Sequence, residues 1–125
     1  MRTEEVIFFT EKEEEFADLL VKIGTQKNVA KVLVFLANIP ESTSRAVERG
    51  TDLRQPEVCV AMKYLVGLSW VKTRETKSET KGRPLKIYCL AKPLHEIIDS
   101  IAIEKKRETN AQLARVKKLR TYIIS

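Results

Sequence analysis

The 125-residue sequence is poor in the residue types that cross-links, metal sites and proton relays require. It contains two cysteines, Cys59 and Cys89, and one histidine, His95. Two cysteines without a CxxC spacing make no disulfide framework and match no metal-ligand pattern. A single histidine leaves no second imidazole for a proton relay. We therefore expect no metal and no cofactor. We interpret each cysteine as a small buried or semi-exposed residue and His95 as a surface or interface residue.

Glycine and long apolar runs are also scarce. The four glycines form no phosphate-binding loop, and no nucleophile-elbow motif occurs. No apolar run approaches the roughly 18 residues that span a bilayer. The N-terminus is acidic and lacks the layout of a signal peptide. We expect a soluble, cytoplasmic protein that is neither an enzyme nor a membrane protein.

Positive charge is abundant and unevenly distributed. The chain has 23 Lys and Arg against 17 Asp and Glu, a net charge of +6. Residues 4–18 hold seven acidic side chains and one lysine, whereas residues 72–86 hold six basic and two acidic ones. Residues 104–120 hold seven basic and two acidic side chains. This distribution favours a polyanionic partner for two regions in the second half of the chain.

The N-terminal part, residues 1–24, combines an apolar arm with an acidic helix. Val6–Phe9 is either a strand or an arm that packs on a neighbour. Thr10 and Glu13 have the spacing of a capping box, and Gly24 is typical of a helix C-terminus. We interpret the glutamates between them as a solvated helix start. The predicted buried stripe of this helix is Phe16, Leu19, Leu20 and Ile23.

The next three helices come from residues 25–92, which we expect to form the central domain. The first runs from about Lys27 to Asn38, capped by Thr25 and stopped at Ile39-Pro40. The second is short and begins at one of three candidate caps. The turn is predicted at 50–52, and Pro56 occupies the first position of the third helix behind a Gln55 cap. The candidate caps are Ser42, Thr43 and Ser44, and the apolar stripe of the third helix is Val58, Ala61, Met62, Leu65 and Leu68.

A basic hairpin and a long helix complete the chain. Trp70–Thr76 and Leu85–Leu90 are the predicted strands, joined by a loop over 77–82. The last helix, in residues 93–125, begins near Pro93 and runs to about Ile123. It has two apolar stripes separated by the polar residues 104–110, so either a second copy covers it or a kink there folds the tail back. The predicted dimer contacts are Leu94, Ile97, Ile98, Ile101, Leu113, Val116, Leu119 and Ile123.

The predicted fold class is therefore mainly α with a small β-hairpin, a winged helix-turn-helix with a long C-terminal dimerisation helix. In this arrangement the third helix enters the DNA major groove and the hairpin contacts the backbone or minor groove. Arg54 suits guanine and Gln55 suits adenine. Taken singly, each is better explained as an ordinary solvated residue, but their combination with the basic hairpin favours DNA. The candidate DNA contacts are Ser44, Arg45, Arg54, Gln55, Glu57, Val60, Lys63, Tyr64, Arg74, Lys77, Lys81 and Arg83.

Residues 25–95 resemble winged-helix transcriptional regulators of the ArsR and MarR type, and most closely small archaeal ones. The resemblance is carried by Leu53-x4-Val58-x3-Met62-x2-Leu65, Trp70-Val71 and Gly82-Arg83-Pro84-x3-Tyr88-x-Leu90. It implies a recognition helix over 55–67, a wing over 77–83, and a homodimer that binds an inverted-repeat operator in double-stranded DNA. Asp52 and Ser69 stand where many relatives have glycine, and the cysteine or histidine sets of the metal-sensing relatives are absent. The resemblance does not identify an effector.

A second hypothesis keeps the fold but changes the partner. The same domain can act as a protein adaptor in a transcription or RNA-processing assembly. The acidic first helix and the apolar 6–9 arm support this alternative. Association that is insensitive to salt, without duplex binding, would distinguish it from the DNA-binding hypothesis.

Overall fold

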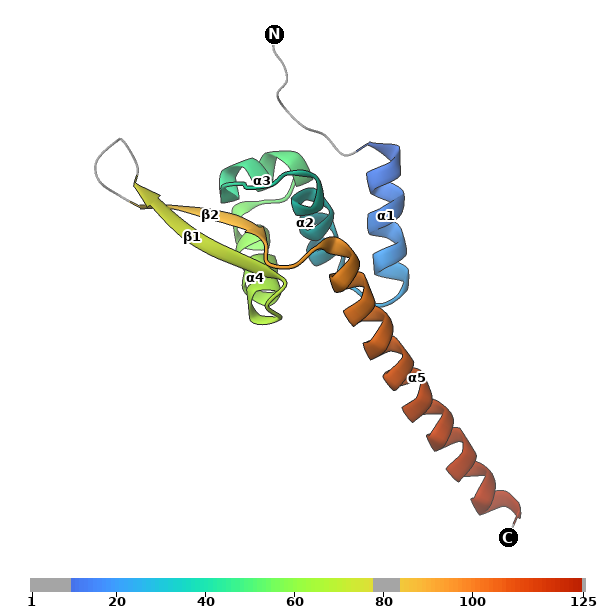
Figure 1. Ribbon diagram of the computed structural model, residues 1–125. Helices are drawn as coiled ribbons and strands as arrows, with labels where there is room; N and C mark the ends of the chain where they lie inside the picture. The colour runs from blue at the N-terminus through green and yellow to red at the C-terminus, as the bar shows by residue number, and fades with distance from the viewer. Residues whose placement is uncertain (1–9, 78–83, 125) are drawn as a thin grey trace. The chain divides into compact units, whose positions relative to one another are not determined.

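The computed structural model describes residues 10–77 and 84–124 (Figure 1). The chain divides into two units, residues 1–92 and 93–125, which we describe separately. Within the described residues the predicted fold class is confirmed: helices dominate, one antiparallel hairpin follows them, and a long helix ends the chain. The elements are α1 (Glu11–Lys22), α2 (Lys27–Asn38), α3 (Ser44–Thr51), α4 (Gln55–Gly67), β1 (Val71–Lys77), β2 (Pro84–Leu90) and α5 (Leu94–Ile124).

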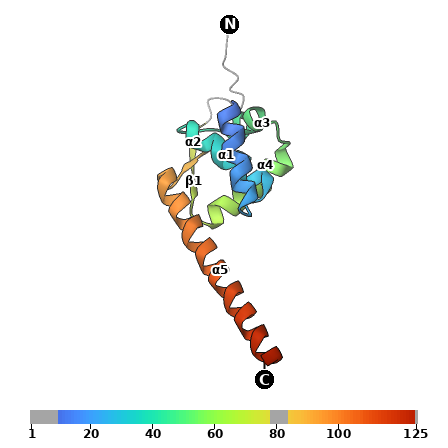
Figure 2. The ribbon, with the colours of Figure 1, turned by 90° about the vertical axis from the view of Figure 1, so that its right-hand side faces the viewer.

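Helix α2 is the centre of the first unit. It is apolar on almost all sides, and every residue from Val32 to Leu36 is buried. Helices α1, α3 and α4 pack on it, and Figure 2 shows α1 alongside α2. Full burial of one Val or Leu side chain contributes about 1.5–3 kcal/mol, so this helix supplies much of the hydrophobic stabilisation of the unit. The neighbouring elements complete the core with Ala17, Leu20, Val47, Val58, Ala61, Met62, Leu65 and Val71.

Helix α1 begins and ends as predicted but buries a narrower strip. The Thr10 backbone N–H donates to Glu13 Oε1 at 2.8 Å, and the Glu13 N–H donates to Thr10 Oγ1 at 3.3 Å. Gly24 follows the helix with φ of 109°. The predicted stripe is wrong for Leu19 and Ile23, which are 61% and 43% exposed. Because α1 packs chiefly against α2, Ala17 and Leu20 are the only residues of α1 that are buried.

The helix starts differ from the predictions by one residue in two places. Gln26, and not Thr25, precedes α2, and its side chain makes no capping bond. Helix α3 is capped by Thr43, whose Oγ1 accepts from the Ala46 N–H at 3.2 Å. Arg54, and not Gln55, is the N-cap residue of α4, so Pro56 is at the second helical position. Proline fits there because no intrahelical donor is lost in the first turn.

The turn between α3 and α4 is later than predicted. Helix α3 continues through Gly50 to Thr51, and the chain reverses at Asp52, with φ of 61°. Gly50 is buried against Phe35 of α2, so its small size serves packing and not the turn. Ser69 adopts φ of 65° before β1. Asp52 and Ser69 thus hold the left-handed conformation that glycine usually adopts. Leu68 was also predicted to be buried, but it is 38% exposed.

The hairpin is joined to the segment that precedes α3. Strands β1 and β2 are antiparallel, with Val71 opposite Leu90 and Lys77 opposite Pro84. On the other side of β2, Ser42 pairs with Tyr88: the Ser42 N–H donates to the Tyr88 carbonyl at 3.0 Å, and the Tyr88 N–H donates to the Ser42 carbonyl at 2.8 Å. The hairpin extends away from α2, α3 and α4 (Figure 1). The predicted arm 6–9 and loop residues 78–82 lie outside the described residues.

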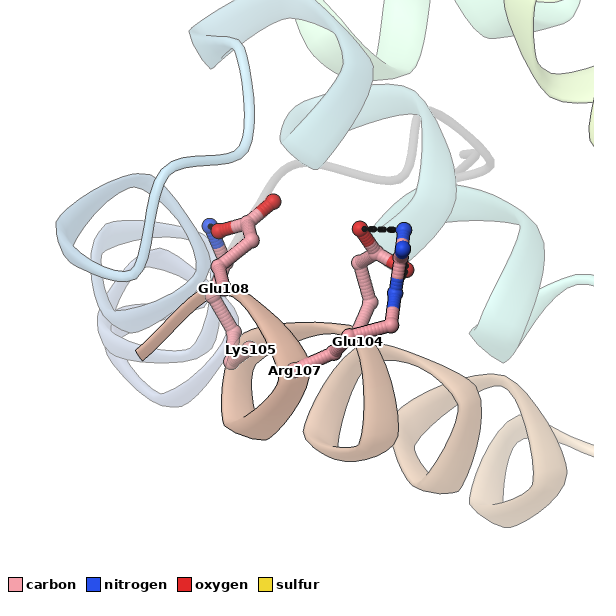
Figure 3. A network of polar contacts seen from close by, with 4 residues as sticks. All are labelled: Glu104, Lys105, Arg107 and Glu108. Carbon is pink, nitrogen blue, oxygen red and sulfur yellow. Dashed lines mark hydrogen bonds and ion pairs between the residues drawn. The ribbon is translucent and has the colours of Figure 1, made fainter. Parts of the chain in front are cut away.

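The second unit contains α5, one helix of 31 residues. At about 1.5 Å per residue it is about 46 Å long. The helix continues without interruption through residues 104–110, so the alternative of a kink in this stretch is wrong. Two ion pairs stabilise this polar stretch, as Figure 3 shows: Arg107 Nη2 lies 2.8 Å from Glu104 Oε2, and Lys105 Nζ lies 3.1 Å from Glu108 Oε1.

Candidate nucleic-acid interface

Helices α3 and α4 form a helix-turn-helix with one buried and one exposed face. In α4, Val58, Ala61, Met62 and Leu65 are buried, which fixes the rotation of the helix. The opposite face and the first turn are open to solvent. Their exposed residues include five of the six contacts predicted for α4 and its N-cap: Arg54, Gln55, Val60, Lys63 and Tyr64. Ser44 and Arg45 begin α3, where Arg45 is exposed and Ser44 is half-buried.

The exposed face of α4 carries two large apolar side chains. Val60 is 62% exposed and Tyr64 is 56% exposed, and they lie four residues apart on the helix. Neither is needed in the core, since the buried stripe is complete without them. An apolar group can contact the thymine methyl in the major groove, and a tyrosine hydroxyl can bond to a phosphate. Together with Lys63, this face can make both base and backbone contacts.

Glu57 makes a hydrogen bond at the start of α4 that the sequence prediction did not include. Its Oε1 accepts a hydrogen bond from the Arg54 backbone N–H at 2.9 Å, and the residue is half-buried. This bond satisfies one of the free donors at the start of α4, and a carboxylate there also suits the helix dipole. Glu57 therefore holds the backbone of Arg54 at the helix start. A glutamate in the major groove can accept a hydrogen bond from the amino group of cytosine, but one of the two oxygens of Glu57 is already engaged and is less available for this contact.

Arg74 on β1, predicted to contact DNA, is paired with a carboxylate. Its Nε donates to Glu41 Oε2 at 3.1 Å and its Nη2 donates to Glu41 Oε1 at 2.7 Å. The hydrogen bonds from Arg74 lower the pKa of Glu41, and those to Glu41 raise the pKa of Arg74. Lys77 is the last residue of β1, and the structure describes its backbone only. The predicted contacts Lys81 and Arg83 lie outside the described residues.

A groove runs between α4 and the hairpin. Its volume is about 350 Å³. Two lysines, Lys63 from α4 and Lys86 from β2, line it together with the hydroxyl-bearing Thr73 and Tyr88, and its remaining lining residues are Cys59, Met62, Val66 and Gly67. The combination of two cations and two hydroxyl groups suits a phosphodiester.

The predicted contact set omitted Thr73, Lys86 and Tyr88. The strand register explains their position, because Thr73 lies opposite Tyr88 and Glu75 lies opposite Lys86. Alternate residues of a strand share one face, so all of these lie on the side of Val71, which is buried. Alternation counted from Val71 would have identified Thr73 from the sequence, whereas Tyr88 and Lys86 also require the register of β2.

The apolar residues of α5 differ strongly in exposure. Ile97 and Ile101 are buried, and Leu94 and Ile98 are half-buried, so these predicted dimer contacts offer little free surface. The later part of the helix is open. Its exposed apolar side chains are Leu113 (58%), Val116 (47%), Leu119 (61%) and Ile123 (82%), to which Ile103 and Tyr122 add two that were not predicted.

Neither a metal-binding cluster nor a membrane-spanning helix occurs in the described parts of the chain. No three His, Cys, Asp or Glu side chains in residues 10–77 and 84–124 gather where they could hold a metal ion. Cys59 is exposed and Cys89 is half-buried, and both are free thiols. None of the helices in these ranges combines the length and apolarity that a membrane crossing requires.

The fold is similar to that of solved transcription regulators. A possible transcriptional regulator from Methanosarcina mazei Go1 matches with a TM-score of 0.63 at 16% identity, over 80% of this chain and 82% of that one. A MarR family transcription regulator matches with a TM-score of 0.52 at 12% identity, over 90% and 78% of the two chains. Reduced AbfR, solved bound to DNA, matches with a TM-score of 0.50 at 18% identity, over 91% and 84%.

These similarities show the fold of the chain. It is the winged helix-turn-helix of MarR-type regulators, which confirms the predicted resemblance at the level of architecture. No family model matches the sequence, and no curated protein matches it significantly.

Proposed function

We propose that this protein is a sequence-specific, double-stranded DNA-binding transcriptional regulator that acts as a homodimer. The observation that carries the proposal is the groove between α4 and the hairpin, where Lys63 and Lys86 from two different elements line the same groove together with the hydroxyl groups of Thr73 and Tyr88. Its position beside the exposed face of α4 allows one strand of a duplex to be held while its bases are contacted. The net charge of +6 favours the same polyanionic partner.

Helix α4 is the proposed recognition helix. Arg54 and Gln55 stand at its exposed start, where side chains reach base edges when a helix enters the major groove end-on. Val60 and Tyr64 extend the contact along the same open face. A bidentate base contact from Arg54 or Gln55 would discriminate by about 1–3 kcal/mol against a wrong base.

The backbone contacts are proposed to come from α3, from Lys63 of α4 and from the hairpin. Arg45 is exposed in the first turn of α3, and Lys63 and Lys86 line the groove. The wing residues Lys77, Lys81 and Arg83 are included on sequence grounds alone. Each lysine or arginine that neutralises a phosphate releases condensed counterions, so binding should weaken steeply with salt.

The dimer is proposed to form through α5. Leu113, Val116, Leu119 and Ile123 are spaced by three or four residues and therefore share one exposed side of the helix. A soluble protein rarely leaves such a stripe uncovered, and a second copy of the helix has the matching shape. Two recognition helices would then bind half-sites about 10 bp apart, centre to centre.

The experiment that tests the function is selection of fragments from sheared host genomic DNA by the purified protein at near-physiological salt. Enrichment of a short inverted repeat is the expected result. Binding without enrichment would indicate a nonspecific role driven by charge. If no fragment binds, the regulator is ruled out and the protein-adaptor hypothesis takes its place.

Variants separate base recognition from backbone contact. Arg54→Ala with Gln55→Ala should relax the sequence preference of the enriched fragments. Lys63→Gln and Lys86→Gln should each weaken binding to all sequences and reduce the salt slope by about one. Lys22→Gln removes the same charge at an exposed position of α1 and is the matched control. It should leave the DNA affinity and the salt slope unchanged. A wild-type preference in the Arg54 and Gln55 variant would show that another element recognises the bases.

A further inference from the structure

The Glu41–Arg74 pair joins two segments that are distant in sequence. Glu41 lies between α2 and α3, and Arg74 lies in the middle of β1. Both nitrogens of one edge of the guanidinium donate, to different oxygens of the same carboxylate, at 3.1 Å and 2.7 Å. This two-point geometry restricts rotation, so the pair can define an orientation as well as a distance.

The pair crosses a strand that is already attached to the same segment. Arg74 lies opposite Ile87 of β2, and the next β2 residue, Tyr88, pairs with Ser42. The 41–42 segment is thus tied by backbone hydrogen bonds to β2 and by the carboxylate of Glu41 to β1. Both strands of the hairpin are held from one side by two consecutive residues.

The same segment also leads directly into the helix-turn-helix. Thr43, the next residue, caps α3 through its bond with the Ala46 N–H. Three consecutive residues therefore contact β1, contact β2 and begin α3. A change in the direction of the hairpin would have to move the start of α3 or break one of these contacts.

We propose that Arg74 is a positioning residue: with Glu41 it holds the hairpin at a fixed angle to α3 and α4, and it does not contact DNA itself. This inference rests on the proposed DNA-binding function. The paired charges sum to zero, so Arg74 would release no counterion from a phosphate unless it first left Glu41. The alternative is that Arg74 binds a phosphate and Glu41 only competes for it.

Two single variants distinguish these alternatives by the direction in which each changes the affinity for DNA. If Arg74 is a positioning residue, Glu41→Gln and Arg74→Gln should both weaken DNA binding, each about two- to five-fold, the range reached by exposed ion pairs. The double variant should be no weaker than either single one, and the salt slope should be unchanged. If Arg74 contacts a phosphate, Arg74→Gln should weaken binding and reduce the slope by about one, whereas Glu41→Gln should strengthen binding. That opposite pair of signs would overturn the proposal, and so would two variants without effect.

Controls come from the same strand and from the groove. Glu75→Gln makes the same change as Glu41→Gln one position beyond Arg74, on the other face of β1, and should not reproduce the loss. Lys63→Gln shows the slope change that a true phosphate contact gives. Arg74→Lys should also bind DNA more weakly than the wild type, because an ammonium group cannot provide the planar two-point contact with Glu41.

A measurement without DNA keeps the inference independent of the proposed function. Amide hydrogen exchange at Ser42 and Tyr88 reports the backbone bonds between the 41–42 segment and β2. Both single variants should accelerate exchange at these two amides about two- to five-fold while exchange in α2 stays unchanged. Unchanged exchange would overturn the inference even if the protein binds DNA. Accelerated exchange in a protein that binds no DNA would support the positioning of the hairpin and reject only the DNA-binding function.

Discussion

Gly50 of α3 faces the phenyl ring of Phe35 in α2 so closely that a side chain does not fit between them. A Cβ atom placed on Gly50 would lie 2.6 Å from Cδ1 and 2.9 Å from Cζ of that ring. Both residues are buried, so the ring has little room to move aside. The close approach of α3 to α2, and with it the placement of the helix-turn-helix, depends on the absence of a side chain at this position.

Gly50→Ala is therefore expected to destabilise the protein. Overpacking of a buried position costs about 1–3 kcal/mol, which outweighs the gain of up to about 1 kcal/mol that alanine brings to a helix. Gly67→Ala is the matched control, since a Cβ there meets nothing within 4 Å. Urea unfolding should show a lower midpoint for the first variant and an equal or higher one for the second. Equal midpoints for the two variants would contradict the packing argument.

Thr43→Ala should also lower stability, through the loss of the α3 cap. The Thr43 hydroxyl accepts from the Ala46 N–H, and removal of such a cap costs about 0.5–2 kcal/mol. Gln26→Ala changes the equivalent position of α2, where the side chain makes no capping bond, and should have a smaller effect. The two unfolding free energies, measured under the same conditions, test the difference. A larger loss at Gln26 would exclude capping as the cause.

The element order and the core of α2 could be predicted from the sequence because local signals determine them. Thr10 and Glu13 mark the start of α1, and the apolar run 32–36 marks a helix buried on all sides. The errors arose where a tertiary contact competes with a local signal. Gly50 resembles a turn residue but is required by Phe35, and Leu19 has the spacing of a core residue but finds no neighbour to cover it.

The candidate site was only partly predictable for the same reason. The exposed start of α4 follows from helix periodicity, which leaves Arg54 and Gln55 outside the buried stripe. The partner of Arg74 could not be anticipated, since Glu41 is 33 residues away and the pairing depends on how the hairpin packs. Lys86 belongs to the groove because of the strand register, which periodicity within a single strand does not determine.

The Glu41–Arg74 pair should make stability depend on acid pH. The pKa of Glu41 in the folded protein lies below its ordinary value of 4.5, so the pair stabilises the fold above about that pH and is lost as pH falls through the lowered pKa. The wild-type protein should exceed Glu41→Gln in stability at neutral pH, and this difference should disappear in acid. Urea midpoints of both proteins from about pH 7 to about pH 3 measure it. A difference that persists in acid would show that charge is not its origin.

Leu113→Asp and Leu119→Asp should weaken the proposed dimer. Each buries a charge in place of a leucine whose burial is worth about 1.5–3 kcal/mol, so each Kd should rise at least about tenfold. Ala114→Asp adds the same charge on the opposite side of α5 and controls for net charge and helix propensity. Sedimentation measures the Kd, and circular dichroism checks that α5 remains helical. If all three variants sediment alike, α5 is not the dimer contact.

The Ser42–Tyr88 pairing has a consequence for the order of folding. The two residues are 46 positions apart, and α3, α4 and the hairpin lie between them. Closing a chain segment of this length costs entropy that only the contacts of those intervening elements can offset. These two backbone bonds should therefore form late. During refolding, the amides of Ser42 and Tyr88 are expected to become protected from exchange after those of α2, so that β2 attaches to an already assembled helix-turn-helix.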